Sequence, residues 1–133
     1  MKIPILRLGK ILLTSVQVDL TDAAVLQFQK DLVNKIVAVE AQGVAIDITS
    51  LEVLDSYMVR VFNDTASMAQ LLGCEVVICG VHPSIAITLV EMGRNLIGVD
   101  CTFTLEQGMK ILTERIASRG DADLFQGHQY AVD

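Results

Sequence analysis

Apolar and polar residues alternate along the chain in blocks that predict strands and helices in turn. Two apolar, β-prone runs at residues 3–8 and 11–18 are separated by Gly9-Lys10, which suits the tight turn of a hairpin. Three further strands are expected at residues 44–48, 74–81 and 100–104. The first two of these runs are almost continuously apolar, which is typical of strands buried on both faces of a parallel sheet.

Four segments carry apolar residues at spacings of three and four, which predicts amphipathic helices. They begin near residues 22, 55, 83 and 105, and the first three are expected to end at Gly43, Gly73 and Gly93. The second helix, from about Asp55 to Leu72, is apolar on more than one side. That pattern predicts packing on a sheet and on a further partner.

The order of these elements predicts an α/β fold. A hairpin is followed by alternating helices and strands, which gives one mixed, largely parallel central β-sheet with about four helices and an N-terminal β-hairpin. The chain has 133 residues, the size of a single domain. We place this domain at residues 1–118 and expect residues 119–133, which lack helical periodicity, to be a mobile C-terminal tail.

Composition narrows the classes of function. The net charge is −6, with ten basic residues scattered along the chain, which disfavours nucleic acid and anionic membranes as partners. Hydrophobic residues make up 52%, yet no apolar run approaches the roughly 18 to 20 residues of a membrane span. Arg7 and Lys10 interrupt the N-terminal apolar runs, and no signal-peptide cleavage site follows. The sequence therefore predicts a cytoplasmic protein that buries apolar surface against other chains.

The cysteines predict neither metal nor redox chemistry. Cys74, Cys79 and Cys101 are odd in number and lack CxxC spacing, so we expect reduced core residues in a protein without a metal or other cofactor.

Motifs for catalysis are missing from the sequence. It contains no GxGxxG, Walker, GxSxG or HExxH pattern. His82 lies beside a proline at a helix start and His128 lies in the tail, so they do not predict a nucleophile–base pair. A receiver domain would need an acidic pair, such as Asp19 and Asp22, an acceptor such as Asp47, and a lysine after the last strand. That lysine is absent, and we expect a protein that is not an enzyme.

The segment 47–62, DITSLEVLDSYMVRVF, presents one hydroxyl at the start of the second helix. Ser56 follows Asp55 where an N-cap is expected, and side chains there are usually exposed. One interpretation is that both are ordinary helix-start residues, and Thr49 with Glu52 forms a competing capping-box pattern. The other is that Ser56 accepts a phosphoryl group that controls a protein–protein contact.

This segment resembles the phosphorylation segment of STAS domains, in which a strand ending in Asp is followed by a short loop, an Asp-Ser pair and a helix. Anti-anti-sigma factors are the best-known members. Their usual Asp-Ser-Ser-Gly form is absent, because Tyr57 follows Ser56. The Asp-Ser-aromatic version and the short chain are similar to the RsbS-type antagonists of the bacterial stressosome. The likeness covers residues 1–118 in element order and is specific across residues 47–62.

The resemblance implies a cytoplasmic scaffold that forms homo- and hetero-oligomers through STAS domains with co-antagonists of RsbR type. It implies a serine kinase of RsbT type as a partner, sequestered until the chain is phosphorylated at Ser56. We expect the partner surface to comprise Thr49, Glu52, Asp55, Tyr57 and Arg60. Tyr57 is either an aromatic anchor for the partner or an intramolecular packing residue. Thr49 and Ser50 remain alternative acceptors.

Two further functions stay open on the sequence. The first alternative is an anti-anti-sigma factor that binds an anti-sigma kinase. The second is a STAS domain that binds a small ligand or nucleotide. The second lacks the glycine-rich loop that usually cradles phosphate. A small enzyme would need a pocket of titrating groups, and the sequence offers only scattered carboxylates.

Overall fold

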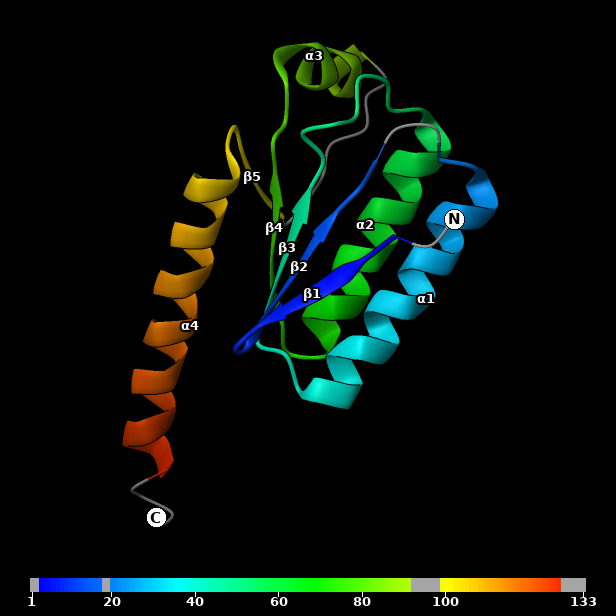
Figure 1. The fold of residues 1–133 in the computed structure, drawn as a ribbon. Coiled ribbons are helices and arrows are strands. Elements are labelled where there is room, and N and C mark those ends of the chain that lie inside the picture. Colours follow the sequence, from blue (N-terminus) through cyan, green and yellow to red (C-terminus); the bar gives the residue numbers. More distant parts are fainter. Residues whose placement is uncertain (1–2, 18–19, 92–98, 128–133) are drawn as a thin grey trace.

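The computed structural model describes residues 3–17, 20–91 and 99–127, with side chains as far as residue 119. Five strands form one sheet in the order β1-β2-β3-β4-β5 (Figure 1). The strands are β1 (Ile5–Leu8), β2 (Ile11–Ser15), β3 (Gly43–Asp47), β4 (Glu75–Cys79) and β5 (Asp100–Thr102). The helices are α1 (Asp22–Val39), α2 (Ser56–Leu71), α3 (Pro83–Glu91) and α4 (Leu105–Gly127). β1 pairs with β2 antiparallel, and the other neighbours pair parallel.

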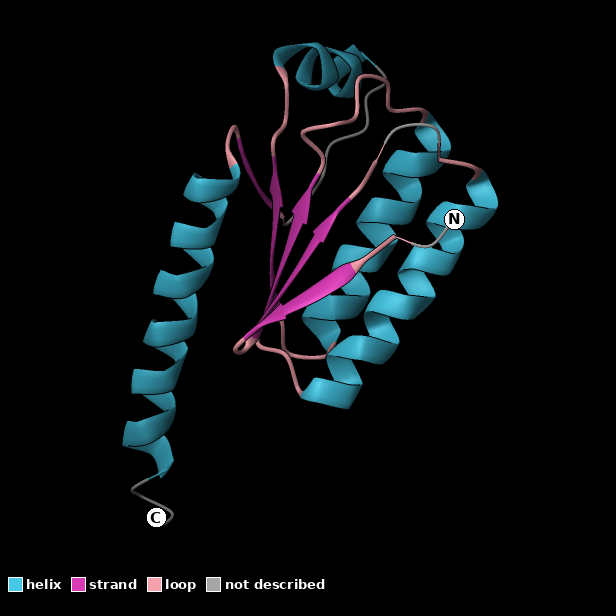
Figure 2. Ribbon diagram, in the orientation of Figure 1, coloured by secondary structure: helices cyan, strands magenta, loops and turns pink. Residues whose placement is uncertain are grey.

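This arrangement confirms the predicted fold class. The hairpin, the mixed and largely parallel sheet and the four helices all appear in the expected order. Figure 2 shows α1 and α2 on one face of the sheet, α4 on the other, and α3 across one end. The parallel strands all finish at the end where α3 lies, so every strand-to-helix connection of this sheet gathers there.

Two apolar clusters fill the two sides of the sheet. The larger one lies against α1 and α2 and includes Phe28 and Phe62, whose ring centroids are 6.5 Å apart in an edge-on arrangement. The smaller one lies beneath α4 and consists of Ala45, Val77, Cys79 and Leu112. At Gly108 a Cβ would collide with the Sγ of Cys79, so glycine lets α4 approach the sheet closely.

Gly43 does not end the first helix, contrary to the prediction. Glu40 ends it instead, with a left-handed backbone (φ 52°) and an N–H that bonds the carbonyl of Ile36. Gly43 begins β3, where a Cβ would lie 2.8 Å from the side chain of Ile116 on α4. Its small size therefore serves packing between the sheet and α4. Gly73 does follow α2 and has φ +90°, whereas Gly93 lies outside the described residues.

The last helix is longer than predicted. It runs to Gly127, so residues 119–127 are helical although the sequence predicted a tail there. Figure 1 shows that this part of α4 extends past the sheet. A helix without a sheet beneath it needs no apolar stripe, and no proline in this stretch stops it. The domain boundary at residue 118 and the mobility of residues 119–133 remain predictions.

All three cysteines are free thiols, but only two are core residues. Cys74 and Cys79 are buried, and burial raises the pKa of Cys74 to about 11. Cys101 is exposed, contrary to expectation, because β5 is a strand of three residues at the edge of the sheet.

Candidate functional site

One carboxylate fixes the start of the connection between β3 and α2, residues 48–55. Asp47 Oδ1 accepts hydrogen bonds from the backbone N–H of Thr49 at 3.0 Å and from its hydroxyl at 2.5 Å. Asp47 Oδ2 accepts a third bond from the hydroxyl of Ser15 on β2 at 3.2 Å. Bonds to a charged acceptor are stronger than neutral ones. The connection is therefore tied to two strands at its first turn.

The connection between β4 and α3 contacts the same turn. Gly80 has φ +80°, and a Cβ there would lie 2.8 Å from the backbone nitrogen of Thr49. His82 Nε2 lies 2.7 Å from the carbonyl oxygen of Thr49, which can only accept, so this nitrogen donates. His82 is thus a turn residue, as its place beside Pro83 predicts.

Two buried leucines hold the middle of the connection. Leu51 and Leu54 are 3% and 2% exposed and belong to the larger core cluster. The N–H of Leu51 also donates to the carbonyl of Ile48 at 2.9 Å. Between them Glu52 and Val53 face solvent, and Val53 is 75% exposed. Burial of Leu51 and Leu54 therefore fixes the path that the chain takes to the start of α2.

Asp55 caps α2 and places Ser56 on its first turn. Asp55 has an extended backbone, and its Oδ1 accepts a bond from the N–H of Met58 at 2.8 Å. Ser56 is the first helical residue and is exposed. Its neighbour Met58 turns into the core. The helix start therefore presents a hydroxyl to solvent beside the positive end of the helix dipole.

The competing capping box does not form. Thr49 bonds Asp47 instead of a helix N–H, and no helix begins between Thr49 and Asp55. The hydroxyl of Thr49 donates at short distance to a carboxylate, which makes it a less available acceptor than Ser56. Ser50 is exposed and has no such bond among the described residues.

The predicted partner surface lies along the connection between β3 and α2 and on the first turns of α2. Its members are all exposed, namely Thr49, Glu52, Asp55, Tyr57 and Arg60. Tyr57 is 37% exposed, which is consistent with either of its two interpretations. Thr49 and Asp55 also make the hydrogen bonds that shape the connection, so their side chains have a structural role that the sequence pattern did not separate from binding.

Several apolar residues at this end of the sheet are exposed, which the sequence pattern did not lead us to predict. Val53, Ile87, Val90 and Phe103 are 75%, 59%, 72% and 60% exposed. Ile87 and Val90 lie on α3, and Phe103 follows β5 at the same end (Figure 1). The nearly unbroken apolar run of residues 85–90 was the available signal.

The described residues contain no group of three or more His, Cys, Asp or Glu arranged to hold a metal ion. No helix in the described ranges is both long enough and apolar enough to cross a membrane. What the arrangement offers chemically is an accessible hydroxyl on a rigid turn, flanked by backbone N–H groups.

The fold, with this connection at its carboxyl end, is that of a STAS domain. The chain matches the STAS domain family over residues 2–104, and it belongs to that family.

Solved structures place it near one group within the family. A serine-to-glutamate variant of RsbS from Moorella thermoacetica is 34% identical, with a TM-score of 0.77 over 86% of this chain and 97% of that one. A chain from the molecular architecture of the stressosome, described as a signal integration and transduction hub, is 36% identical, with a TM-score of 0.75. That match covers 85% of this chain and 98% of the other.

A curated relative points the same way. The RsbT co-antagonist protein RsbRA of Bacillus subtilis (strain 168) is 29% identical over 99 residues, which is 71% of this chain. The chain spans only 36% of the length of that relative. Over most of its length, the chain is therefore similar to the STAS proteins of the stressosome.

We predict that Gly80→Ala destabilises the domain more than Gly9→Ala. Both glycines have positive φ, where a side chain costs about 1–2 kcal/mol. A Cβ at Gly9 meets open space, whereas at Gly80 it clashes with the backbone of Thr49, which adds roughly 1–3 kcal/mol. Urea unfolding measures both losses, and equal losses would show that the Thr49 contact is unimportant.

We also predict that Asp55→Ala lowers the free energy of unfolding by about 1 kcal/mol, since the N–H of Met58 loses its acceptor. Asp55→Asn keeps an oxygen at the same place and should lose much less. Thermal and urea unfolding of the two variants test this, and a full loss in Asp55→Asn would contradict the capping role.

Proposed function

We propose that this chain is a non-enzymatic phosphoswitch scaffold of a bacterial stress-signalling complex, the stressosome. It binds and sequesters an RsbT-type serine kinase and releases it when Ser56 is phosphorylated. The observation that carries the proposal is the exposed hydroxyl of Ser56 on the first turn of α2, in a chain similar to RsbS over most of its length. The protein acts in the cytoplasm and assembles through STAS domains with copies of itself and with RsbR-type co-antagonists.

The fold tolerates a phosphate at Ser56. Phosphorylation adds about −1.5 to −2 charges at neutral pH. At the first turn of α2 these charges meet backbone N–H groups that have no partner within the helix, and they meet the positive end of the helix dipole. Arg60, exposed four residues further along the helix, adds a cation near the same face. The domain therefore keeps its structure while its surface changes.

The same phosphate weakens the binding of a partner that covers Ser56. Asp55 already places a carboxylate beside Ser56, so a bound kinase would enclose two neighbouring anionic groups. Leaving an ion unpaired in an interface costs several kcal/mol. Each 1.4 kcal/mol weakens binding about tenfold, so one phosphate is enough to release a partner held at micromolar affinity.

The exposed apolar residues near the site supply contact area for the kinase. Tyr57, Val53, Ile87 and Val90 offer side chains that a partner can bury, and interface energy concentrates on a few such residues. We assign them to the partner surface together with Thr49, Glu52, Asp55 and Arg60.

Incubation with an RsbT-type kinase and ATP should add one phosphate, at Ser56. Ser56→Ala should abolish incorporation, because among the three candidate hydroxyls only that of Ser56 lies on the first turn of a helix. Thr49→Val and Ser50→Ala should retain it. Mass spectrometry of the intact chain and of its peptides reads out the position. Phosphate on Thr49 or Ser50, or none in any variant, would contradict the assignment.

The affinity for the kinase should fall when residue 56 carries a negative charge. Ser56→Ala should bind as tightly as the wild type and fail to release the kinase in the presence of ATP. Ser56→Asp should bind about tenfold or more weakly while its circular dichroism stays native. Ser67→Asp adds the same charge to an exposed position further along α2 and serves as the control. Equal dissociation constants for a folded Ser56→Asp variant and this control would speak against release by charge.

A further inference from the structure

Arg60 is the only lysine or arginine in a long stretch of the chain that includes the candidate site. In the sequence, no other lysine or arginine occurs between Lys35 and Arg94. This stretch contains the β3–α2 connection, α2, the β4–α3 connection and α3. Any anion that these elements present to solvent therefore has Arg60 as its one permanently charged cation among them.

Arg60 and Ser56 lie on one exposed stripe of α2. Ser56, Arg60 and Asp64 follow one another at intervals of four residues, and all three are exposed. Residues at this spacing are neighbours on a helix, with Cβ atoms about 5–6 Å apart. The Cα–Cβ bond of a helical residue leans toward the N-terminus of the helix, so the side chain of Arg60 covers the turn that carries Ser56.

Arg60 is not held elsewhere by an ion pair. The ion pairs among the described residues all involve arginines of α4, and none involves Arg60. Asp64 lies four residues after Arg60, but an acid that precedes a base by four positions pairs better than one that follows it. An anion at Ser56 has the favoured order. A phosphate there also carries more charge than the carboxylate of Asp64.

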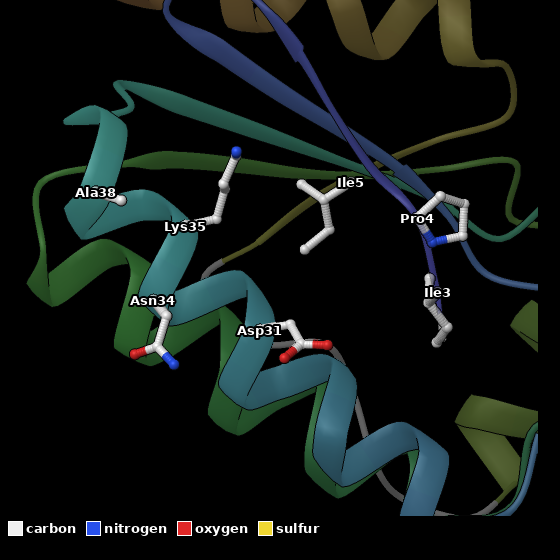
Figure 3. Close-up of a pocket in the computed structure, with 7 residues that line it drawn as sticks. All are labelled: Ile3, Pro4, Ile5, Asp31, Asn34, Lys35 and Ala38. Atoms are coloured by element: carbon white, nitrogen blue, oxygen red, sulfur yellow. The ribbon is translucent and has the colours of Figure 1, made fainter. Parts of the chain in front are cut away.

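The basic residues of α1 lie beside other parts of the surface. Gln29 Nε2 donates to Thr65 Oγ1 at 3.1 Å, so Lys30, which follows Gln29, lies level with the third turn of α2 and not with its first. Lys35 lines a cavity of about 520 Å³ between α1 and β1, and Figure 3 shows its side chain rising from α1 toward the sheet. Neither lysine replaces Arg60 as the cation next to Ser56.

The start of α2 already holds an anion. Asp55 Oδ1 accepts the N–H of Met58 at 2.8 Å, and the carbonyl of Asp55 accepts the N–H of Val59 at 3.1 Å. Only the N–H groups of Ser56 and Tyr57 are then left on this turn for a phosphate. The carboxylate of Asp55 also repels a second anion beside it. A side-chain cation therefore supplies attraction that the capped helix end lacks.

We infer that Arg60 holds the phosphate of phosphorylated Ser56, its guanidinium pairing with the phosphate oxygens on the surface of α2. Arginine presents its N–H groups as a fork that matches two phosphate oxygens. One cation neutralises only part of the roughly −1.5 to −2 charges of a phosphate, so the surface stays anionic. The inference rests on the proposed phosphorylation of Ser56 and adds that the same modification withdraws Arg60 from a partner.

This pairing indicates what kind of partner the surface fits. Before modification, Arg60 stands among the exposed carboxylates of Glu52, Asp55 and Asp64, so it is the group that attracts an acidic side chain of the partner. After modification, the phosphate competes for Arg60 within the same chain, at a high effective concentration. Phosphorylation then adds an anion and removes a cation contact in one step.

Phosphoserine placed at residue 56 during translation of the full chain tests the pairing without a kinase. Phosphorus NMR titration measures the second pKa of the phosphate, which is about 6 when no cation pairs with it. Pairing with Arg60 favours the dianion and lowers this pKa. Arg60→Gln should therefore raise it by about 0.3 or more, and Arg60→Lys, which keeps the charge but not the fork, should raise it less.

Two controls distinguish this pair from a general effect of charge. Lys110→Gln removes a positive charge from α4, on the other face of the sheet, and should leave the pKa unchanged (Figure 2). Phosphoserine in place of Ser67, about two turns past Arg60, should titrate alike with and without Arg60→Gln. The inference is overturned if Arg60→Gln leaves the pKa of phosphoserine at residue 56 unchanged, or if Lys110→Gln shifts it as much.

Affinity for an RsbT-type kinase gives a second measurement. Arg60→Gln should weaken binding of the unphosphorylated chain about fivefold, and binding of the chain with phosphoserine at residue 56 by less than about twofold, because Arg60 is already withdrawn. Equal losses in the two forms would overturn the withdrawal of Arg60. A kinase that binds both forms of the wild type equally, while the pKa difference persists, would support the pairing and contradict the release step of the proposed function.

Discussion

The carboxylate of Asp47 is the constraint on which the candidate site depends. It stands at the end of a buried strand and satisfies a backbone N–H and two hydroxyl groups, one of them from the neighbouring strand. Without it the first turn after β3 would lose its charged acceptor, and the donors of Thr49 would be left without their partner. The proposed phosphoswitch needs a fixed scaffold. Otherwise the new charge would be absorbed by rearrangement of the loop instead of acting on a neighbour.

Local chemistry was enough to predict the start of α2. Asp55 and Ser56 were placed correctly because an N-cap depends only on the few residues that follow it. The role of Thr49 could not be predicted in this way. Its partner Asp47 competes with the helix for the same hydroxyl, and Gly80, which presses on the turn, comes from a distant part of the sequence. The choice between two local patterns was thus made by tertiary structure.

The same limit explains the remaining differences in the fold. Gly43 looked like a helix end, but it begins β3 and leaves room for the side chain of Ile116, far along the chain on α4. The length of α4 was underestimated because apolar periodicity reports only the part of a helix that lies on the sheet. The high apolar content predicts surface that other chains bury, and that use stays a prediction. The structure places exposed apolar residues at the β1 edge, with Leu6 and Leu8, and at the end of the sheet near Ser56.

The face of the sheet beneath α4 has a consequence for biosynthesis. Ala45 and Val77 lie on β3 and β4, and α4, the helix that covers them, is synthesised after both strands. While translation proceeds, the nascent polypeptide carries a bare apolar face, because domains acquire their stable packing only when the required segments have emerged from the ribosome. Closure of this face therefore waits until α4 has been synthesised and can fold. Until then, chaperones have a defined surface to shield from aggregation.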